Sequence, residues 1–329
     1  IGGFFYTVLS LFMIQNLDSE TKLISGTLGI FYAIAAMISF ILFVKRVLSD
    51  IKAENVIENI YNNADKLIVK ESEKRKIAER FDSGDWDETY KIYANDSGYL
   101  YGINADKLLS LIEDNKYEII INKRINDYVL KGMYIAKLNL LKDLDMDQEE
   151  KDKFFEKISS NILINIKKND TKDYHHELTN LVEVSLKALS PGINDPNTAS
   201  EAIIKLGILL GKLFSSENFY QILEEDENAK IIYNNYSAKE ELQLSYNQIL
   251  FYGKSDPEIA KTVLNSIYMV YLVTDKSLHR EVEKYFTYCY ELCKEAMDNQ
   301  SYIDQLDEIY KDFEQKKDDS MDKDINKED

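Results

Sequence analysis

The sequence predicts a mainly α protein built from three parts: an N-terminal transmembrane helical hairpin, a small β module and a cytoplasmic helical bundle. Two uncharged stretches open the chain, and tyrosine-rich, β-branched segments follow them. Apolar residues then recur every three to four positions almost to the end, which is the period of an amphipathic helix. The expected parts are the hairpin at 1–47, a helical stalk at 48–81, the β module at 82–145, the bundle at 146–314 and a disordered acidic tail at 315–329.

The composition limits the partners and the compartment. The chain has 329 residues, of which 30% are charged, and its formal net charge is -18. Because nucleic acid repels a chain of this charge, we expect no nucleic-acid partner. The two cysteines, Cys289 and Cys293, do not have the spacing of a disulfide framework, which fits a reducing compartment.

The hairpin prediction depends on two stretches without a charged residue. Leu23 to Val44 contains 22 such residues in a row, and a helix needs about 20 to cross a bilayer core of roughly 30 Å. Gly2 to Leu17 is also uncharged but shorter, and it lacks the basic start and the cleavage site of a signal peptide. The alternative is a buried hairpin in a folded core, but core helices seldom exclude polar atoms on every side.

Charges beside the hairpin predict its orientation. The linker Asp18 to Lys22 carries one positive charge, whereas Lys45, Arg46 and Lys52 follow the second stretch. The positive-inside rule then places the rest of the chain in the cytoplasm, in a multi-pass protein of the cell membrane whose partner is the lipid bilayer. The first residue is Ile1 rather than Met, so we expect further chain upstream.

A stalk and a β module are expected next. Ser49 to Arg80 repeats apolar side chains at helical spacing. Strands are expected within Ile92 to Ile103 and Tyr117 to Asn122, and Gly132 turns the chain before another strand. This spacing resembles half of a barrel-sandwich domain of the biotinyl or lipoyl type. No lysine lies between two methionines on a hairpin tip, so we expect no swinging-arm carrier and no cofactor.

From Gln148 onward the periodicity is helical, and it predicts a bundle of about six helices. The residues after Gln315 are rich in Lys, Asp and Glu and almost free of apolar side chains, which is typical of a disordered tail. The apolar stripes lie at 154–166, 178–189, 202–213, 244–251, 259–273 and 282–297.

A turn with two prolines between two predicted helices is the candidate functional segment. Proline lacks an amide donor and disfavours helix at the residue before it, so the first helix must stop near Leu189. In a purely structural interpretation, Gly192 turns the chain and Asn194 or Asp195 caps the next helix. In a functional interpretation, the turn amides and the next helix N-terminus receive an anion. The candidate residues are Ser190, Pro191, Gly192, Asn194, Asp195, Pro196 and Thr198.

Other reactive side chains give no signal for an enzyme. His175 and His176 are adjacent, so on a helix they point about 100° apart and are expected to be a surface pair rather than metal ligands. Cys289 and Cys293 share one helix face, but no second ligand pair accompanies them, and packing is the favoured role. The sequence contains no phosphate loop, nucleophile elbow or zinc-protease motif. We therefore expect no catalytic site, no metal and no enzyme.

The stretch Leu181 to Ala199, with its Ser-Pro-Gly-Ile-Asn-Asp-Pro run, resembles the hallmark of a bacterial predicted-membrane-protein family, domain of unknown function 2254. Gly98 to Leu138 and Gln248 to Pro257 are similar to the same family, so the resemblance covers essentially the whole chain. The chain departs from the family pattern at Glu183 and Lys187, where the family usually has Asp and Arg. The resemblance implies further membrane helices ahead of the hairpin and brings no established activity.

Two functional hypotheses follow from the predicted architecture. The first is a channel, transporter or sensor subunit whose cytoplasmic domain is regulatory, because a membrane hairpin is joined through a helical stalk to a folded domain. The second is a membrane-anchored scaffold that binds a protein partner through its helical domain. We expect a homo-oligomer in either case.

Overall fold

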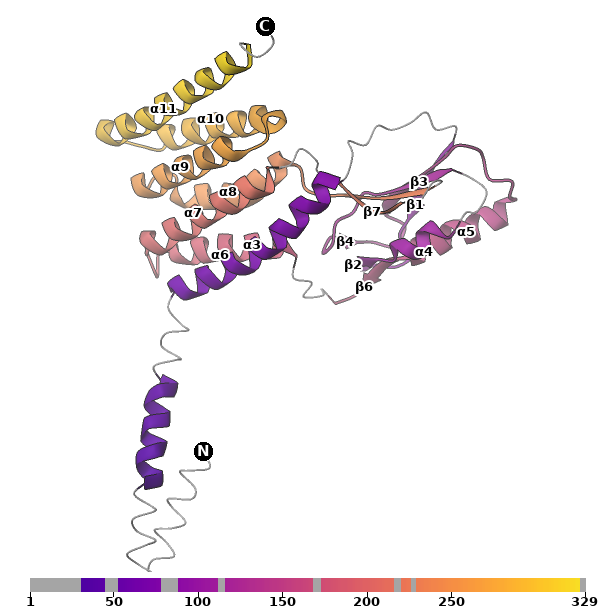
Figure 1. Cartoon of the computed structure of the whole chain (residues 1–329), viewed down its shortest axis with the longest axis horizontal. Helices are drawn as coiled ribbons and strands as arrows, with labels where there is room; N and C mark the ends of the chain where they lie inside the picture. Colours follow the sequence, from indigo (N-terminus) through magenta and orange to yellow (C-terminus); the bar gives the residue numbers. More distant parts are fainter. Residues whose placement is uncertain are drawn as a thin grey trace, which may run out of the picture. The chain divides into compact units, whose positions relative to one another are not determined.

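The computed structural model describes residues 31–44, 53–77, 88–111, 116–167, 173–215, 220–225 and 229–325 (Figure 1). The chain divides into two bodies, Ile1–Asn59 and Ile60–Asp329. Helix α3, Ala53–Ile77, runs across this division. The candidate site lies entirely in the second body.

The prediction of an N-terminal transmembrane hairpin was wrong. Within the part of the chain that the structure describes, no helix combines the length and the apolar character that a membrane span requires. The described residues 31–44 are helical, and the chain on both sides of them lies outside the described residues. The apolar side chains of this helix are exposed, including Phe31 (70%) and Met37 (66%). The other uncharged stretch, Gly2 to Leu17, lies outside the described residues.

The β module is a mixed five-stranded sheet with a three-stranded sheet beside it. The larger sheet has the order β1-β5-β3-β8-β7, in which only β3 and β8 are parallel, with Ile119 opposite Ile231. The smaller sheet has the order β4-β2-β6 and is antiparallel. The strands are β1 Glu88–Tyr93, β2 Gly98–Ile103, β3 Tyr117–Ile121, β4 Tyr128–Val129, β5 Tyr134–Leu140, β6 Ile162–Asn165, β7 Tyr220–Glu225 and β8 Ala229–Asn234.

The expected resemblance to half of a barrel-sandwich domain was also wrong. Strands appear where they were expected, but β6, β7 and β8 come from sequence that was interpreted as helical. The parallel pair of β3 and β8 joins segments more than 100 residues apart, and local periodicity carries no information about such a pairing. Helices α4 (Ala105–Leu109) and α5 (Gln148–Ser160) supply Leu108, Phe154 and Ile158 to the core of this module.

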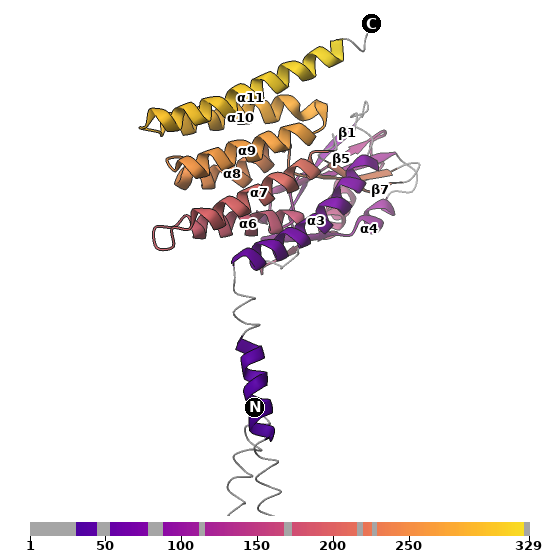
Figure 2. The same ribbon diagram turned by 60° about the vertical axis from the view of Figure 1, so that its left-hand side comes forward.

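The predicted helical bundle is present as α6 to α11, which lie side by side in both views (Figures 1 and 2). Helices α7 and α9 pack closely, because a Cβ on Gly207 would meet the Ser266 hydroxyl and backbone. That hydroxyl donates to the carbonyl of Ile203 at 2.9 Å. The helices are α6 Tyr174–Ala188, α7 Pro196–Leu213, α8 Ala238–Gly253, α9 Pro257–Val273, α10 His279–Glu295 and α11 Gln300–Ile325.

Two helix starts follow the expected Asp-Pro pattern. Asp195 accepts a hydrogen bond from the Thr198 amide at 3.2 Å, and Asp256 accepts from the Ile259 amide at 3.1 Å.

The last helix departs from expectation because α11 continues to Ile325, where a disordered tail was predicted from residue 315. Lys and Glu are good helix formers, and Lys317 pairs with Glu283 of α10 at 2.6 Å.

Candidate functional site

A short connection between strand β8 and helix α8 forms the centre of the candidate site. Strand β8 ends at Asn234, and α8 begins at Ala238. Ser237 caps α8 in a capping box, since it accepts from the Glu240 amide and the Glu240 carboxylate accepts from the Ser237 amide. Because β8 ends just before Asn235 and α8 begins just after Ser237, Asn235 and Tyr236 lie between the sheet and the bundle.

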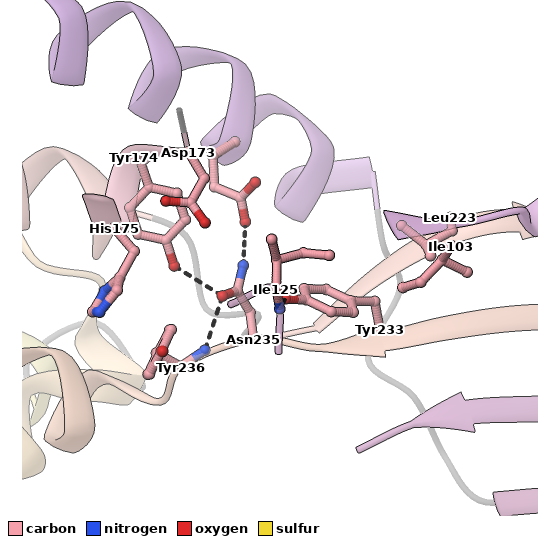
Figure 3. A pocket seen from close by; sticks show the side chains of 10 residues that line it. Ile103, Ile125, Asp173, Tyr174, His175, Leu223, Tyr233, Asn235 and Tyr236 are labelled. Carbon is pink, nitrogen blue, oxygen red and sulfur yellow. Dashed lines mark hydrogen bonds between the residues drawn. The ribbon is translucent and has the colours of Figure 1, made fainter. Parts of the chain in front are cut away.

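Asn235 connects three separate elements (Figure 3). Its side-chain oxygen accepts from the Tyr174 hydroxyl of α6 at 2.9 Å and from the Tyr236 amide at 2.9 Å. Its side-chain nitrogen donates to Glu71 of α3 at 2.6 Å. The residue is only 8% exposed, so these hydrogen bonds replace those that water would make.

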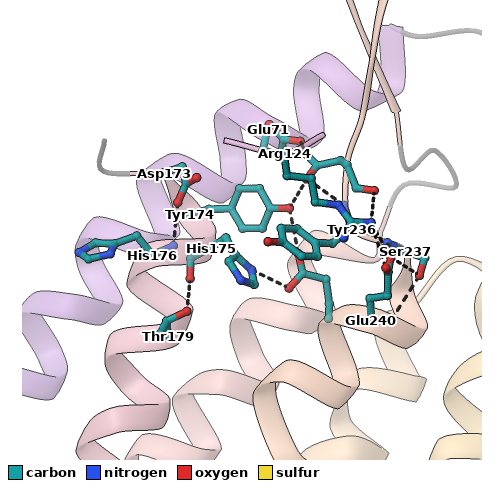
Figure 4. Close-up of polar contacts among 12 residues, drawn as sticks. Glu71, Arg124, Asp173, Tyr174, His175, His176, Thr179, Tyr236, Ser237 and Glu240 are labelled. Atoms are coloured by element: carbon teal, nitrogen blue, oxygen red, sulfur yellow. Dashed lines mark hydrogen bonds and ion pairs between the residues drawn. The ribbon is translucent and has the colours of Figure 1, made fainter. Parts of the chain in front are cut away.

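Glu241 extends the network into the bundle, toward Tyr174 and His175, which Figure 4 labels. It is fully buried on α8, lies 2.9 Å from the Tyr174 hydroxyl and pairs with His175 Nδ1 at 3.2 Å. The single phenolic hydrogen of Tyr174 can serve Glu241 or Asn235, but not both at once. Burial lowers the pKa of His175, but the hydrogen bond and charge of Glu241 outweigh it, so the pKa lies above its usual value. Asp173 acts in the same direction as Glu241, whereas Arg124 opposes it.

The ring of Tyr236 lies between an imidazole and a guanidinium. The His175 imidazole stacks on it with centroids 4.1 Å apart and planes 14° apart, and the Arg124 guanidinium lies 4.0 Å from its centroid. Arg124 in turn donates to both oxygens of Glu240, at 3.0 and 2.9 Å. Burial raises the pKa of Glu240, but the hydrogen bonds from Ser237 and Arg124 outweigh burial and hold that pKa below its usual value.

A cavity of about 260 Å³ opens beside this network. Asp173 and Glu71 contribute carboxylates, and burial raises the pKa of Asp173. Burial also raises the pKa of Tyr236, to about 12, so this phenol stays neutral. The lining residues are Glu71, Ile103, Ile125, Asp173, Tyr174, His175, Leu223, Tyr233, Asn235 and Tyr236 (Figure 3).

A second hollow lies on the Arg124 side of Tyr236, between α6 and α8, with a volume of about 630 Å³. Val182, Leu186 and Leu244 form its apolar part, and Gln243, Asn247 and Gln248 form its amide part. Tyr236 lines both spaces, so its ring separates the buried network from the surface of the bundle.

The predicted functional turn lies away from this network, between α6 and α7. Asn194 has a φ of 48°, and its amide donates to the Ser190 carbonyl at 2.9 Å. Asp195 receives the amide and the hydroxyl of Thr198, at 3.2 and 2.6 Å, and these hydrogen bonds lower the pKa of Asp195. The structural interpretation accounts for all of these contacts, and the functional role of the turn stays a prediction.

The other candidate side chains lie in different parts of the second body. His175 belongs to the buried network and is not the surface residue that we expected, whereas His176 points away from it (Figure 4). Cys289 and Cys293 are free and fully buried in the packing of α10. Among the described residues, no three His, Cys, Asp or Glu side chains gather as metal ligands do.

Sequence reasoning missed Arg124, Tyr236, Glu240 and Glu241. These residues meet only because α8 starts next to β8, and β8 was not recognised as a strand. One local signal was available: Ser237 followed three residues later by Glu240 is a capping box, and it marks the start of α8.

Comparison with known proteins gives one match. The family described as "Predicted membrane protein (DUF2254)" matches residues 1–269, which confirms the resemblance drawn from the sequence. Neither the curated proteins nor the solved structures give a match.

Proposed function

This chain belongs to the DUF2254 family of predicted membrane proteins, and we propose that its second body, Ile60–Asp329, is a sensory domain that binds a small ligand. The ligand would enter the cavity next to Asn235 and change how the sheet module and the bundle are held together. The output would be regulation of a channel or transporter activity in the membrane.

The observation that supports this proposal is the composition of the cavity wall. Its residues come from α3, α6 and strands of both sheets, and the Asn235 hydrogen bonds run along it. A molecule that fills the cavity must therefore touch elements of both the sheet module and the bundle. A ligand with different affinity for two arrangements of these elements shifts the balance between them.

The wall favours an organic cation. Asp173 and Glu71 bring carboxylates, and the rings of Tyr174 and Tyr233 line the same space, where aromatic rings attract positive charge. Of the lining residues only His175 can carry a positive charge, and it pairs with Glu241 behind the wall. The excess of carboxylates disfavours an anion.

The test is thermal unfolding of the purified protein with small organic cations, anions and neutral compounds. We expect choline or putrescine to raise the melting temperature, because a ligand present at 100 times its dissociation constant stabilises by about 2.7 kcal/mol. Ile125→Phe narrows the cavity without removing a side-chain hydrogen bond and should abolish this shift. Ile193→Phe is the matched control, because Ile193 is 62% exposed on the turn after α6.

Two outcomes would contradict the proposal. One is the absence of a shift with any compound in the panel. The other is an equal shift in the wild type and in Ile125→Phe, which would place the binding outside the cavity. Flux measured in vesicles that contain the full-length protein, with and without the stabilising compound, then tests the proposed output.

The placement in the cell belongs to the same proposal. We propose a multi-pass protein of the cell membrane with the sensory domain in the cytoplasm, supported by the family and by the unpaired thiols of Cys289 and Cys293. The exposed apolar residues of helix 31–44 support contact with lipid. No enzymatic reaction is proposed, since the cavity side chains suit binding and regulation.

A scaffold that binds a protein partner is the second candidate function. The observation that favours it is the exposed apolar side of α8, where Phe251 is 74% exposed and Tyr252 is 62% exposed. A scaffold predicts that no small molecule changes the melting temperature and that a partner co-purifies with the wild type but not with Phe251→Glu.

A further inference from the structure

Helix α8 carries charge only at its beginning. Lys239, Glu240 and Glu241 occupy its first turn, and the 12 residues from Leu242 to Gly253 contain no Asp, Glu, Lys or Arg. Helix α9 contains a run of the same length without charge, Thr262 to Val273, so the run by itself does not mark a site. Helix α8 differs because its uncharged part exposes two aromatic rings, Phe251 and Tyr252.

The exposed residues of this part of α8 form one stripe. They recur at three to four residues, as neighbours on one helix face do, and they include two large rings in contact, with centroids 5.1 Å apart. The stripe consists of Leu244 (47% exposed), Asn247, Gln248, Phe251 (74%) and Tyr252 (62%).

Uncharged side chains lie beside the stripe on each side, although Arg124, Glu183 and Glu240 also line the hollow between α6 and α8. On one side lies the hollow of about 630 Å³ with Val182 and Leu186 of α6. On the other side, Tyr285 of α10 donates to Asn247 at 2.8 Å, and Tyr288 beside it is 50% exposed. Exposed aromatic rings with few charges are the composition of an interface core.

We propose that this α8 face binds the same face of a second copy of this chain. A chain with a net charge of -18 repels its copy, and the repulsion is smallest where two uncharged faces meet. A two-fold axis at Gln248 places Leu244 of each copy opposite Tyr252 of the other, because both lie four residues from Gln248. The Gln248 amide has a donor and an acceptor, so it pairs with its own copy across the axis.

The charge pattern disfavours the other occupants. An anionic membrane surface attracts Lys and Arg, and the stripe contains neither. A basic partner protein is steered by acidic residues, and the stripe contains none of those. An interface of about 800 Å² per partner is larger than one stripe, so the hollow on α6 and Tyr288 on α10 take part at its edges.

Disulfide cross-linking of the full-length protein in its membrane tests this proposal. Gln248→Cys lies on the proposed axis, so its two copies should form a disulfide dimer under mild oxidation. Lys153→Cys, on the exposed surface of α5, is the control and should cross-link at least about tenfold less. The native thiols are fully buried and do not compete.

A second substitution tests whether the stripe drives the contact. Phe251→Glu added to Gln248→Cys should reduce cross-linking at least about tenfold, because it brings two like charges together. Leu272→Glu, at the far end of α9 and 50% exposed, should leave cross-linking unchanged. Tyr252→Glu serves as a further variant if the melting temperature shows that Phe251→Glu does not fold. Cross-linking of Gln248→Cys no stronger than that of Lys153→Cys, or unaffected by both Glu variants, would overturn the proposal.

Discussion

The interface between α7 and α9 and the network around Asn235 hold the protein together in opposite ways. The first depends on close approach of backbones at Gly207, with one serine hydroxyl in hydrogen bonds to Ile203 and Tyr246. The second depends on titratable groups, since Glu241, His175 and Glu71 take part in it. A contact fixed by shape does not respond to protons or to small ligands, whereas a contact fixed by charge and hydrogen bonds does.

The largest expected effect is at Gly207. Gly207→Val places side-chain atoms where the Ser266 hydroxyl and backbone lie, at 2.3 and 2.9 Å from a Cβ, and should destabilise the protein by about 3 kcal/mol or more. Chemical denaturation at several pH values measures the loss, which should be independent of pH. Gly192→Ala is the control, because a Cβ there meets nothing within 4 Å. A loss at Gly207 that varies with pH would break the contrast between the two regions.

The next effect is at Glu241. Glu241→Gln removes a charge from a fully buried position and leaves the His175 imidazolium without its partner, which should cost about 2–3 kcal/mol at pH 6. Denaturation at pH 6 measures the cost. Glu183→Gln is the matched control, since Glu183 is exposed on α6 and pairs with Lys187 at 3.7 Å. Equal losses at the two positions would show that the network adds nothing.

The sign of the pH dependence follows from His175. Its pKa in the folded protein lies above the usual value of 6.5, so its stabilising contribution is complete below pH 6.5 and is lost as the pH rises through the folded pKa. Wild-type stability should therefore fall from pH 6.5 upward, and His175→Gln should flatten this part of the curve. A His175→Gln profile parallel to that of the wild type would contradict this assignment.

Substitution of a buried carboxylate in the sheet module should have a smaller effect, and it should stabilise the protein where Glu241→Gln destabilises it. Glu118 is 1% exposed, accepts from Asn139 at 3.1 Å and has one oxygen without a hydrogen-bond partner. Burial raises its pKa above the usual value of 4.5. Glu118 therefore contributes its full share to the stability of the folded protein below pH 4.5, and this contribution is lost as the pH rises through the folded pKa. Glu118→Gln should therefore stabilise the protein at pH 7 by about 1 kcal/mol, measured by denaturation. A loss of stability would reveal a partner that the ionised carboxylate needs.

The smallest expected effect is in the predicted turn. Asp195→Ala removes the helix cap on Thr198 and should cost about 1 kcal/mol, whereas Asp195→Ser should recover most of that loss. Thermal unfolding of the two variants measures the difference. Equal stability of wild type and Asp195→Ala would mean that the residue is kept for a reason other than capping.

The sequence predicted the individual helices better than it predicted which segments pair or pack with one another. The helical stripes and the Asp-Pro helix starts follow from local rules, and α6 to α10 appear where those rules place them. The hairpin prediction was wrong because it rested on the absence of charge alone, and no helix among the described residues is long and apolar enough to cross a membrane. A disordered tail was predicted because these residues include few apolar side chains. In the structure α11 continues through them, and Lys317 forms an ion pair with Glu283 of α10.

The candidate site could not have been predicted from the sequence. Arg124, His175, Asn235 and Glu241 lie on four segments, and they meet only through the parallel pairing of β3 and β8. The side chains are ordinary in type and spacing, so no motif marks them. The proline turn, which was recognisable, is explained by helix caps.

Amide hydrogen exchange tests the central claim most directly, namely that the Asn235 network couples the sheet module to the bundle. Wild type and Glu241→Gln are compared at pH 6, with peptides from the start of α6, from the β8–α8 connection and from the α7–α9 interface. We predict that exchange in the variant accelerates together in the first two peptides and stays unchanged in the third. Acceleration in one of the first two alone, or equal acceleration in all three, would contradict the claim.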